Sequence, residues 1–314
     1  MEDTTATKHP AGTRPPLVGI AATAAAAAAW GMAAVFIKLA TLPALSLTFY
    51  RLAVASVLLL VASLASGRRR VWHALPRAVP AGLLLCGDMC CFFSAVKFTS
   101  IADVTVIGAL QPALVMFAAG PLFGEHIGRR DVAWTALAIA GVVAVVIGGG
   151  VGSTHDLAGD LLATASLGFW SVYFLVSKGA RRHLGALEYT LGVTVVAMIA
   201  TVPIVFIAHQ SLGGIGAISE RNWLWIALLA LVPGGGHLLI NWAHRIVDVS
   251  VSSVVGASNP IFAVVAAWLV LHQSLVVLQI AGGAVGIIAI CAIAGTRRLP
   301  ASSGLEPVAN ETYG

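Results

Sequence analysis

The residues best able to do chemistry in this 314-residue chain are polar side chains set within long apolar runs. Asp88 lies in the run LLLCGDMCCFF, and Arg51 lies inside another apolar run. A carboxylate in hydrocarbon costs about 2.5 to 3.5 kcal/mol on insertion scales, so Asp88 needs a compensating partner. Arg51 or a cationic group on a ligand could neutralise it, and without either Asp88 could carry a proton. A structural Asp88, hydrogen-bonded to a neighbouring helix, is the alternative.

Two amide side chains precede prolines in matching contexts, GALQP at 108–112 and GASNP at 256–260. Proline removes a helical N–H donor and clashes with the carbonyl four residues earlier, which belongs to a glycine in both copies. The expected helix hinges are therefore Gly108, Pro112, Gly256 and Pro260. Gln111 and Asn259 would offer amide groups to a ligand at these breaks. General tolerance of proline in membrane helices is the alternative explanation.

A polar stripe on one helix face is the third candidate feature. His237, Asn241 and His244 are spaced i, i+4 and i+7 after the sequence PGGG. The stripe could bind a substrate, relay protons through His237 or only join helices by hydrogen bonds. Asparagine is a poor metal ligand and no carboxylate shares the face, so we expect no metal site.

Large rings within apolar runs could form the wall of a pocket for an organic ligand. With these rings included, the candidate substrate-binding residues are Trp30, Asp88, Gln111, Trp170, Tyr173, His237, Asn241 and Asn259. Arg51 and Asp88 are the candidates for a charge pair or for ion coupling.

The elements that must position these residues are membrane-spanning helices. The chain is 59% hydrophobic and 10% charged, with a mean hydropathy of +0.93, whereas soluble domains carry about 25% charged residues. Stretches of about 20 apolar residues follow one another closely. The expected spans are roughly 17–37, 43–66, 78–98, 101–123, 131–150, 157–178, 186–208, 222–244, 250–271 and 275–295.

The Lys and Arg residues alternate from loop to loop. If the N-terminus is cytoplasmic, fourteen of them lie in cytoplasmic segments and three in outside segments. The positive-inside rule then places both termini in the cytoplasm. The net charge of +5 therefore reflects orientation in a membrane, and we expect no nucleic-acid partner. The four cysteines lie in expected spans, so we expect no disulfides.

The sequence also repeats itself. An offset of 148 aligns Gly108 with Gly256 and Pro112 with Pro260, and an offset of 140 aligns Trp30 with Trp170. Each half holds five spans, and an odd number makes the second half enter the bilayer from the opposite side. We therefore expect an all-α membrane protein of ten transmembrane helices, built as two inverted five-helix repeats around a central cavity. The expected divisions are a disordered cytoplasmic N-terminus at 1–16, repeats at 17–150 and 157–295, and a disordered cytoplasmic C-terminus at 296–314.

Several short patterns keep a fixed order along the chain. They are W-x7-K at Trp30 and again at Trp170, FYR at 49–51, AVKFTSIAD at 95–103 and FGEH at 123–126. In this order they resemble the EamA-like ten-span type of the drug/metabolite transporter superfamily, from Gly19 to Gly295. The resemblance implies two inverted five-helix bundles and outward movement of small organic solutes, often amino acids or other metabolites. Two departures are His272-Gln273, where the family repeats a glutamate, and Glu188, which lies near the position matching Arg51.

We therefore expect a secondary transporter of the cell membrane, an exporter of small metabolites such as amino acids that works by alternating access of a midplane cavity. Its expected partners are the solute, the lipid bilayer and possible coupling protons, while the sequence leaves the solute and the oligomeric state open. A non-transporting scaffold or receptor is the first alternative, and a membrane-embedded enzyme the second. The chain has no H-E-x-x-H, G-x-S-x-G or Walker motif, so we expect neither catalysis nor a cofactor.

Overall fold

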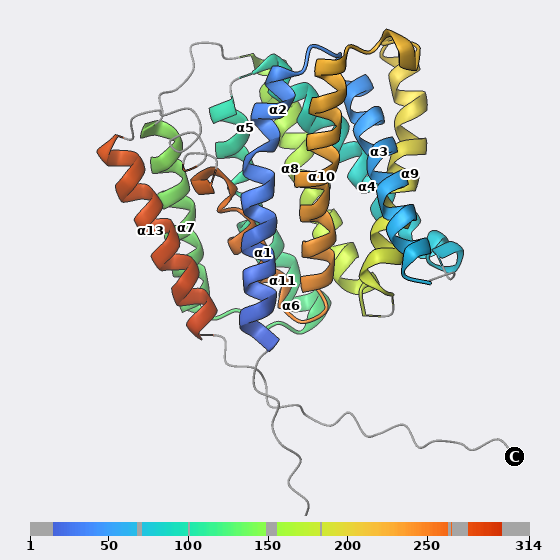
Figure 1. Ribbon diagram of the computed structural model, residues 1–314. Coiled ribbons are helices and arrows are strands. Elements are labelled where there is room, and N and C mark those ends of the chain that lie inside the picture. Colours follow the sequence, from blue (N-terminus) through green and yellow to red (C-terminus); the bar gives the residue numbers. More distant parts are fainter. Residues whose placement is uncertain are drawn as a thin grey trace, which may run out of the picture.

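The computed structural model describes residues 15–67, 71–99, 101–148, 156–182, 184–262, 265 and 276–296. Within these ranges the regular elements are helices and no strand occurs (Figure 1). Seven helical segments of the described chain are long and apolar enough to cross a bilayer. The protein is therefore a multi-pass, all-α membrane protein. The expected disordered tails fall almost wholly outside the described residues.

In the first half, the helices follow the expected spans closely. They are α1 (Pro15–Gly31), α2 (Ala33–Leu39), α3 (Ala44–Ala65), α4 (Val71–Phe98), α5 (Ile101–Gly108), α6 (Gln111–Phe123) and α7 (Arg129–Gly148). Because proline is tolerated in a first helical turn, α1 begins two residues inside the tail expected at 1–16. The first expected span is divided at Met32, where no proline predicted a break.

The second half shows the same succession. Its helices are α8 (Leu157–Ala180), α9 (Ala186–Ile207), α10 (Glu220–Ala243), α11 (Val249–Gly256) and α13 (Val277–Thr296), with the short helix η1 (Ile215–Ala217) before α10. Residues 259–262 are helical again. The rest of the span expected at 250–271 lies outside the described residues except for 265.

Both prolines interrupt their helices where the sequence predicted. Between α5 and α6 the last helical hydrogen bonds run from Ala109 N to Thr105 O and from Leu110 N to Ile107 O. Pro112 has no N–H to continue this ladder, so a new helix starts at Gln111. The same pattern recurs after α11. Ala257 N donates to Ser253 O, and the backbone then turns at residues 257 and 258 before the helix at 259 begins.

Helices from the two halves pack against one another throughout the bundle. α4 packs against α8 and α9, α1 against α10, and α3 against α9. α7 and α13 lie side by side at one edge of the bundle (Figure 1). A Cβ added to Gly141 of α7 would lie 2.7 Å from the carbonyl oxygen of Gly282 in α13. This approach requires glycine, since small residues let membrane helices meet backbone to backbone.

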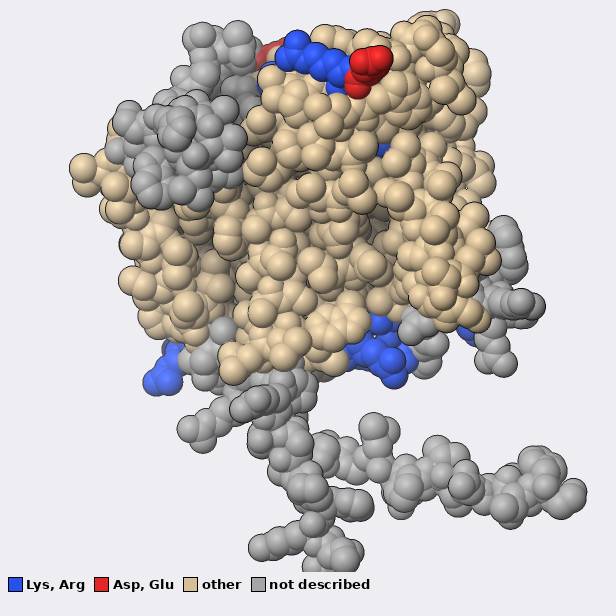
Figure 2. Space-filling view, in the orientation of Figure 1, with Lys and Arg blue, Asp and Glu red and all other residues tan. Residues whose placement is uncertain are grey.

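The start of α1 and the end of α13 lie at the same end of the bundle, here called the terminal end (Figure 1). The segment between α6 and α7 lies at this end as well. Clusters of Lys and Arg side chains border the terminal end in Figure 2, basic and acidic side chains lie together at the opposite end, and the broad flank between the two ends is almost free of charge in that view. An uncharged flank is what a lipid-facing surface requires.

Candidate functional site

A cavity of about 150 Å³ lies where the broken helices meet the centre of the bundle. Helices α1 to α6, α8, α10 and α11 and the segment 257–260 contribute to its wall. From the residues proposed on sequence, the wall includes Trp30, Arg51, Asp88, Gln111, Trp170, His237, Asn259, Gly108, Gly256 and Pro260. The topology therefore brings together side chains separated by more than half of the chain.

Three of the proposed residues are placed elsewhere. Tyr173 and Asn241 are completely buried and do not belong to the described cavity wall. Tyr173 stacks behind Trp170 with ring centroids 5.1 Å apart, and Asn241 Nδ2 donates to the Tyr173 hydroxyl at 3.0 Å and to Thr190 Oγ1 at 3.1 Å. Pro112 lines a separate small cavity between α6, α7 and α13. Tyr173 and Asn241 thus support the wall from behind.

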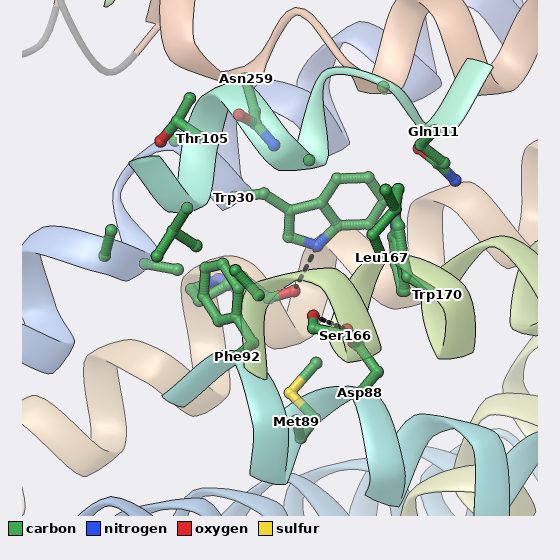
Figure 3. A pocket seen from close by; sticks show the side chains of 18 of the residues that line it. Trp30, Asp88, Met89, Phe92, Thr105, Gln111, Ser166, Leu167, Trp170 and Asn259 are labelled. Carbon is green, nitrogen blue, oxygen red and sulfur yellow. Dashed lines mark hydrogen bonds between the residues drawn. The ribbon is translucent and has the colours of Figure 1, made fainter. Parts of the chain in front are cut away.

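Aromatic rings form one side of the cavity. Trp30 and Trp170 meet edge to face with centroids 5.1 Å apart, and the His237 ring lies 5.5 Å from each. Trp30 Nε1 donates to the carbonyl of Pro233 at 3.2 Å, which fixes the indole (Figure 3). Gly236 makes room for this indole, since a Cβ there would lie 2.8 Å from Trp30 Nε1. The rings therefore provide an aromatic wall for a ligand, with the Trp30 indole fixed by its hydrogen bond.

Two opposite charges face the same cavity. Asp88 is 5% exposed and accepts a hydrogen bond from Ser166 Oγ at 2.6 Å (Figure 3). Arg51 is 3% exposed, donates to Met89 Sδ and lies over the Phe93 ring, 5.8 Å from its centroid. The two charges attract one another through the interior, but among the described residues neither has an ionic partner in direct contact. Arg51, one candidate counter-ion for Asp88, is therefore separated from it.

The two amides next to the prolines face the cavity from the broken helices. Gln111 is 2% exposed, and its Nε2 has no hydrogen-bond partner among the described residues. In Figure 3, Gln111 and Asn259 lie toward one end of the cavity, Asp88 and Met89 toward the other, and Trp30 between them. Nδ1 of His237 is buried and likewise unpartnered in the described chain. Donors and acceptors are therefore available for a polar ligand or for water.

Sequence inspection missed several residues of the wall. Ser166, Met89 and Phe92 line the cavity but were not singled out. A helical-face argument could have found two of them, because Phe92 follows Asp88 by four residues and Ser166 precedes Trp170 by four. Met89 gave no such signal, because nothing distinguishes one apolar residue from its neighbours in an apolar run.

The rest of the polar stripe continues away from the cavity toward the terminal end. His244 is 1% exposed and packs on Phe174 at 4.9 Å between ring centroids. Arg181 Nε donates to the backbone carbonyl of Asn241 at 2.6 Å, and burial lowers the pKa of the Arg181 guanidinium. Within the described residues no group of three or more His, Cys, Asp or Glu side chains is placed to bind a metal.

Comparison with known proteins agrees with this architecture. The chain is 22% identical over 267 residues to the pseudopaline exporter of Pseudomonas aeruginosa, covering 82% of this chain and 89% of that protein. It is 38% identical over 69 residues to an uncharacterized transporter of Synechocystis sp., covering 20% of this chain and 21% of that one. A solved structure titled only as the crystal structure of a protein has the same fold, with a TM-score of 0.73 and 20% identity over 90% of this chain and 98% of that chain.

The model of the EamA-like transporter family matches residues 17–147 and again residues 157–295. These two matches take in all of the described helices that carry the cavity. The chain therefore belongs to the EamA-like transporter family.

Proposed function

We propose that the protein is a secondary transporter of the cell membrane that exports a small zwitterionic metabolite, such as an amino acid or a related compound. The observation that carries this proposal is the pair of buried, opposite and separated charges, Asp88 and Arg51, on one cavity wall. A charge held in a low-dielectric interior without an ionic partner is costly. A bound zwitterion would neutralise both charges at once, because its ammonium group would lie near Asp88 and its carboxylate near Arg51.

The remaining cavity residues fit the body of such a solute. The rings of Trp30 and Trp170 would contact its apolar part. Gln111 Nε2 and the amide of Asn259 would orient its polar groups from the broken helices. The cavity volume of about 150 Å³ suits a compact metabolite better than a lipid or a peptide. Asp88 is also the proposed site for a coupling proton.

Alternating access follows from the proposed inverted repeats, 17–150 and 157–295. Two lysines related by the repeat make equivalent contacts: Lys38 Nζ donates to Thr99 O at 3.2 Å, and Lys178 Nζ donates to Val247 O. The offset of 140 that relates the lysines and the offset of 148 that relates their acceptors are those of the sequence repeat. Equivalent contacts at opposite ends support two halves that exchange conformations around one midplane site.

The direction and orientation are proposed on two further observations. Basic side chains border the terminal end, which by the positive-inside rule would face the cytoplasm and place both termini there. A relative over most of the chain is named an exporter. Export from the cytoplasm is therefore the favoured direction.

The test is flux in liposomes that contain the purified protein. We expect the wild type to move at least one radiolabelled α-amino acid from a panel, and Asp88→Asn to lower its flux at least tenfold with unchanged elution on size exclusion. Asp156→Asn is the matched control, since Asp156 caps the exposed start of α8 and the amide oxygen can keep that role. Equal flux in Asp88→Asn and wild type would refute the proposed role of Asp88. No flux for any solute, with a stoichiometric protein partner co-purifying, would favour a scaffold.

A further inference from the structure

The carboxylate of Glu125 joins the two halves of the chain. Glu125 lies between α6 and α7, and its Oε1 accepts a hydrogen bond from Val249 N at 2.8 Å. Its Oε2 accepts from Ser250 N at 3.2 Å and from Ser250 Oγ at 2.6 Å. Val249 and Ser250 form the first turn of α11 and are 0% and 3% exposed. Three donors at the start of one helix therefore converge on one carboxylate from the other half.

Such a contact is strong for two reasons. The first N–H groups of a helix have no partner within the helix and carry the positive end of its dipole. Hydrogen bonds to a charged acceptor are about twice as strong as those between neutral groups. Glu125 is itself partly exposed and supplies the charged acceptor, while the donors on Val249 and Ser250 are buried.

The position of this contact links it to the cavity. α6 starts at Gln111 on the cavity wall and ends next to Glu125, while α11 starts at Val249 and ends at Gly256 on the wall. The two helices pack on one another between these points. Glu125 therefore lies at the end of this helix pair that is remote from the cavity wall.

Two further contacts strengthen the same end. The Arg182 guanidinium lies 5.3 Å from the centroid of the Phe123 ring. Lys178 donates to Val247 O, two residues before α11. The ends of α6 and α8 and the start of α11 therefore meet around Glu125.

We propose that Glu125 is the positioning residue that holds α6 and α11 together and so closes the mouth of the cavity at the terminal end. The proposal rests on the proposed transport function, in which this mouth must open once per cycle. The residue that matches Glu125 in the second repeat at the offset of 148 is the neutral Gln273. The sequence repeat therefore provides no second carboxylate at this position, and we expect the two mouths to differ in their resting state.

The test measures access to the cavity without any solute. In a variant whose native cysteines are replaced by serine, Ala34→Cys places a single thiol on the cavity wall in α2. A membrane-impermeant maleimide is added to vesicles of either orientation. In separate vesicles, Arg129→Cys at the exposed start of α7 identifies the orientation that presents the terminal end.

With Glu125 intact, we expect slow labelling from the terminal end. Glu125→Gln loses the charge and turns an amide donor toward the N–H groups, so labelling from that end should rise about tenfold. Labelling from the opposite end should fall or stay constant. Ser250→Ala removes one of the three donors and should give a rise of about threefold. Glu125→Asp should restore slow labelling at least in part.

The matched control is Glu220→Gln, the same chemical change at an exposed glutamate in the first turn of α10. It should leave both labelling rates unchanged. Unaltered labelling in Glu125→Gln, or a rise from both ends as in a loosened fold, would overturn the proposal. Because labelling requires no solute, a protein that opens but moves no tested solute would contradict the proposed function and not the proposed role of Glu125. If Glu125→Gln cannot be purified, the graded Ser250→Ala and Glu125→Asp variants decide the question.

Discussion

Two adjacent glycines in α10 allow a sharp test of how the cavity wall is built. A Cβ added to Gly236 would lie 2.8 Å from Trp30 Nε1 and 3.2 Å from the backbone oxygen of Ala26. A Cβ added to Gly235 would meet nothing within 4 Å among the described residues. Gly236→Ala and Gly235→Ala therefore make the same chemical change with different steric consequences.

The expected magnitudes follow from the contacts. Alanine is favoured over glycine in a helix interior by about 1 kcal/mol, so Gly235→Ala should be neutral or stabilising. In Gly236→Ala the backbone of Ala26 cannot easily yield, and the Trp30 indole must move. Overpacking costs about 1 to 3 kcal/mol, and loss of the Trp30 hydrogen bond to Pro233 adds about 0.5 to 1.5 kcal/mol. Gly236→Ala should therefore be less stable than Gly235→Ala by about 2 to 4 kcal/mol.

The assay is thermal unfolding of both variants in the same detergent, followed by circular dichroism at the helix band. At about 2 °C per kcal/mol for a chain of this size, Gly236→Ala should melt about 4 to 8 °C below Gly235→Ala. The order of the two transitions is the decisive quantity, because unfolding in detergent need not be two-state. A Gly236→Ala variant that melts at or above Gly235→Ala would refute the close packing of α1, Trp30 and α10.

Three further outcomes are expected. Gly141→Ala should lower stability in detergent by about 1 to 3 kcal/mol, because its Cβ would meet the α13 backbone at 2.7 Å, whereas Gly168→Ala, with open space around it, should not. Equal melting of the two variants would contradict the α7–α13 contact. Tyr173→Phe removes the hydroxyl that bonds Asn241, so it should lower stability in the same assay by about 1 to 2 kcal/mol while solute flux persists. Complete loss of flux would instead indicate that Tyr173 belongs to the binding site. Ser166→Ala should destabilise the wild type by about 1.5 to 3 kcal/mol, because it removes a hydrogen bond to a charged carboxylate, and it should destabilise an Asp88→Asn protein by less. Additive losses of stability in the double variant would contradict the Ser166–Asp88 contact.

Seven of the ten expected spans match helices of the described chain that are long and apolar enough to cross a bilayer, because bilayer thickness fixes the length of an apolar helix. The breaks before Gln111 and Asn259 were also predictable, since a proline cannot continue the backbone ladder. The break at Met32 was not, because Gly31 before it weakens a helix without forbidding one. The sequence therefore predicted the helix breaks caused by proline but not the break at Met32.

The site was predicted less completely than the fold. Periodicity placed His237 and Asn241 on one face of α10, but it could not say that the cavity ends between them. The sequence likewise could not show whether Tyr173 faces the cavity or packs behind its wall, because the neighbour of a helix face depends on tertiary packing. Arg51 was one candidate counter-ion for Asp88, but Asp88 bonds Ser166 and Arg51 bonds Met89. Ser166 escaped notice because a small hydroxyl in an apolar helix is unexceptional by sequence.

The most direct test of the account is which chemical groups of a solute the cavity requires. In liposomes loaded with an exported radiolabelled amino acid, the unlabelled amino acid, its N-acetyl derivative and its methyl ester are compared as competitors of efflux. We expect competition by the zwitterion alone in the wild type, and a loss of discrimination against the N-acetyl derivative in Asp88→Asn. Equal competition by all three compounds in the wild type would contradict recognition of opposite charges by Asp88 and Arg51.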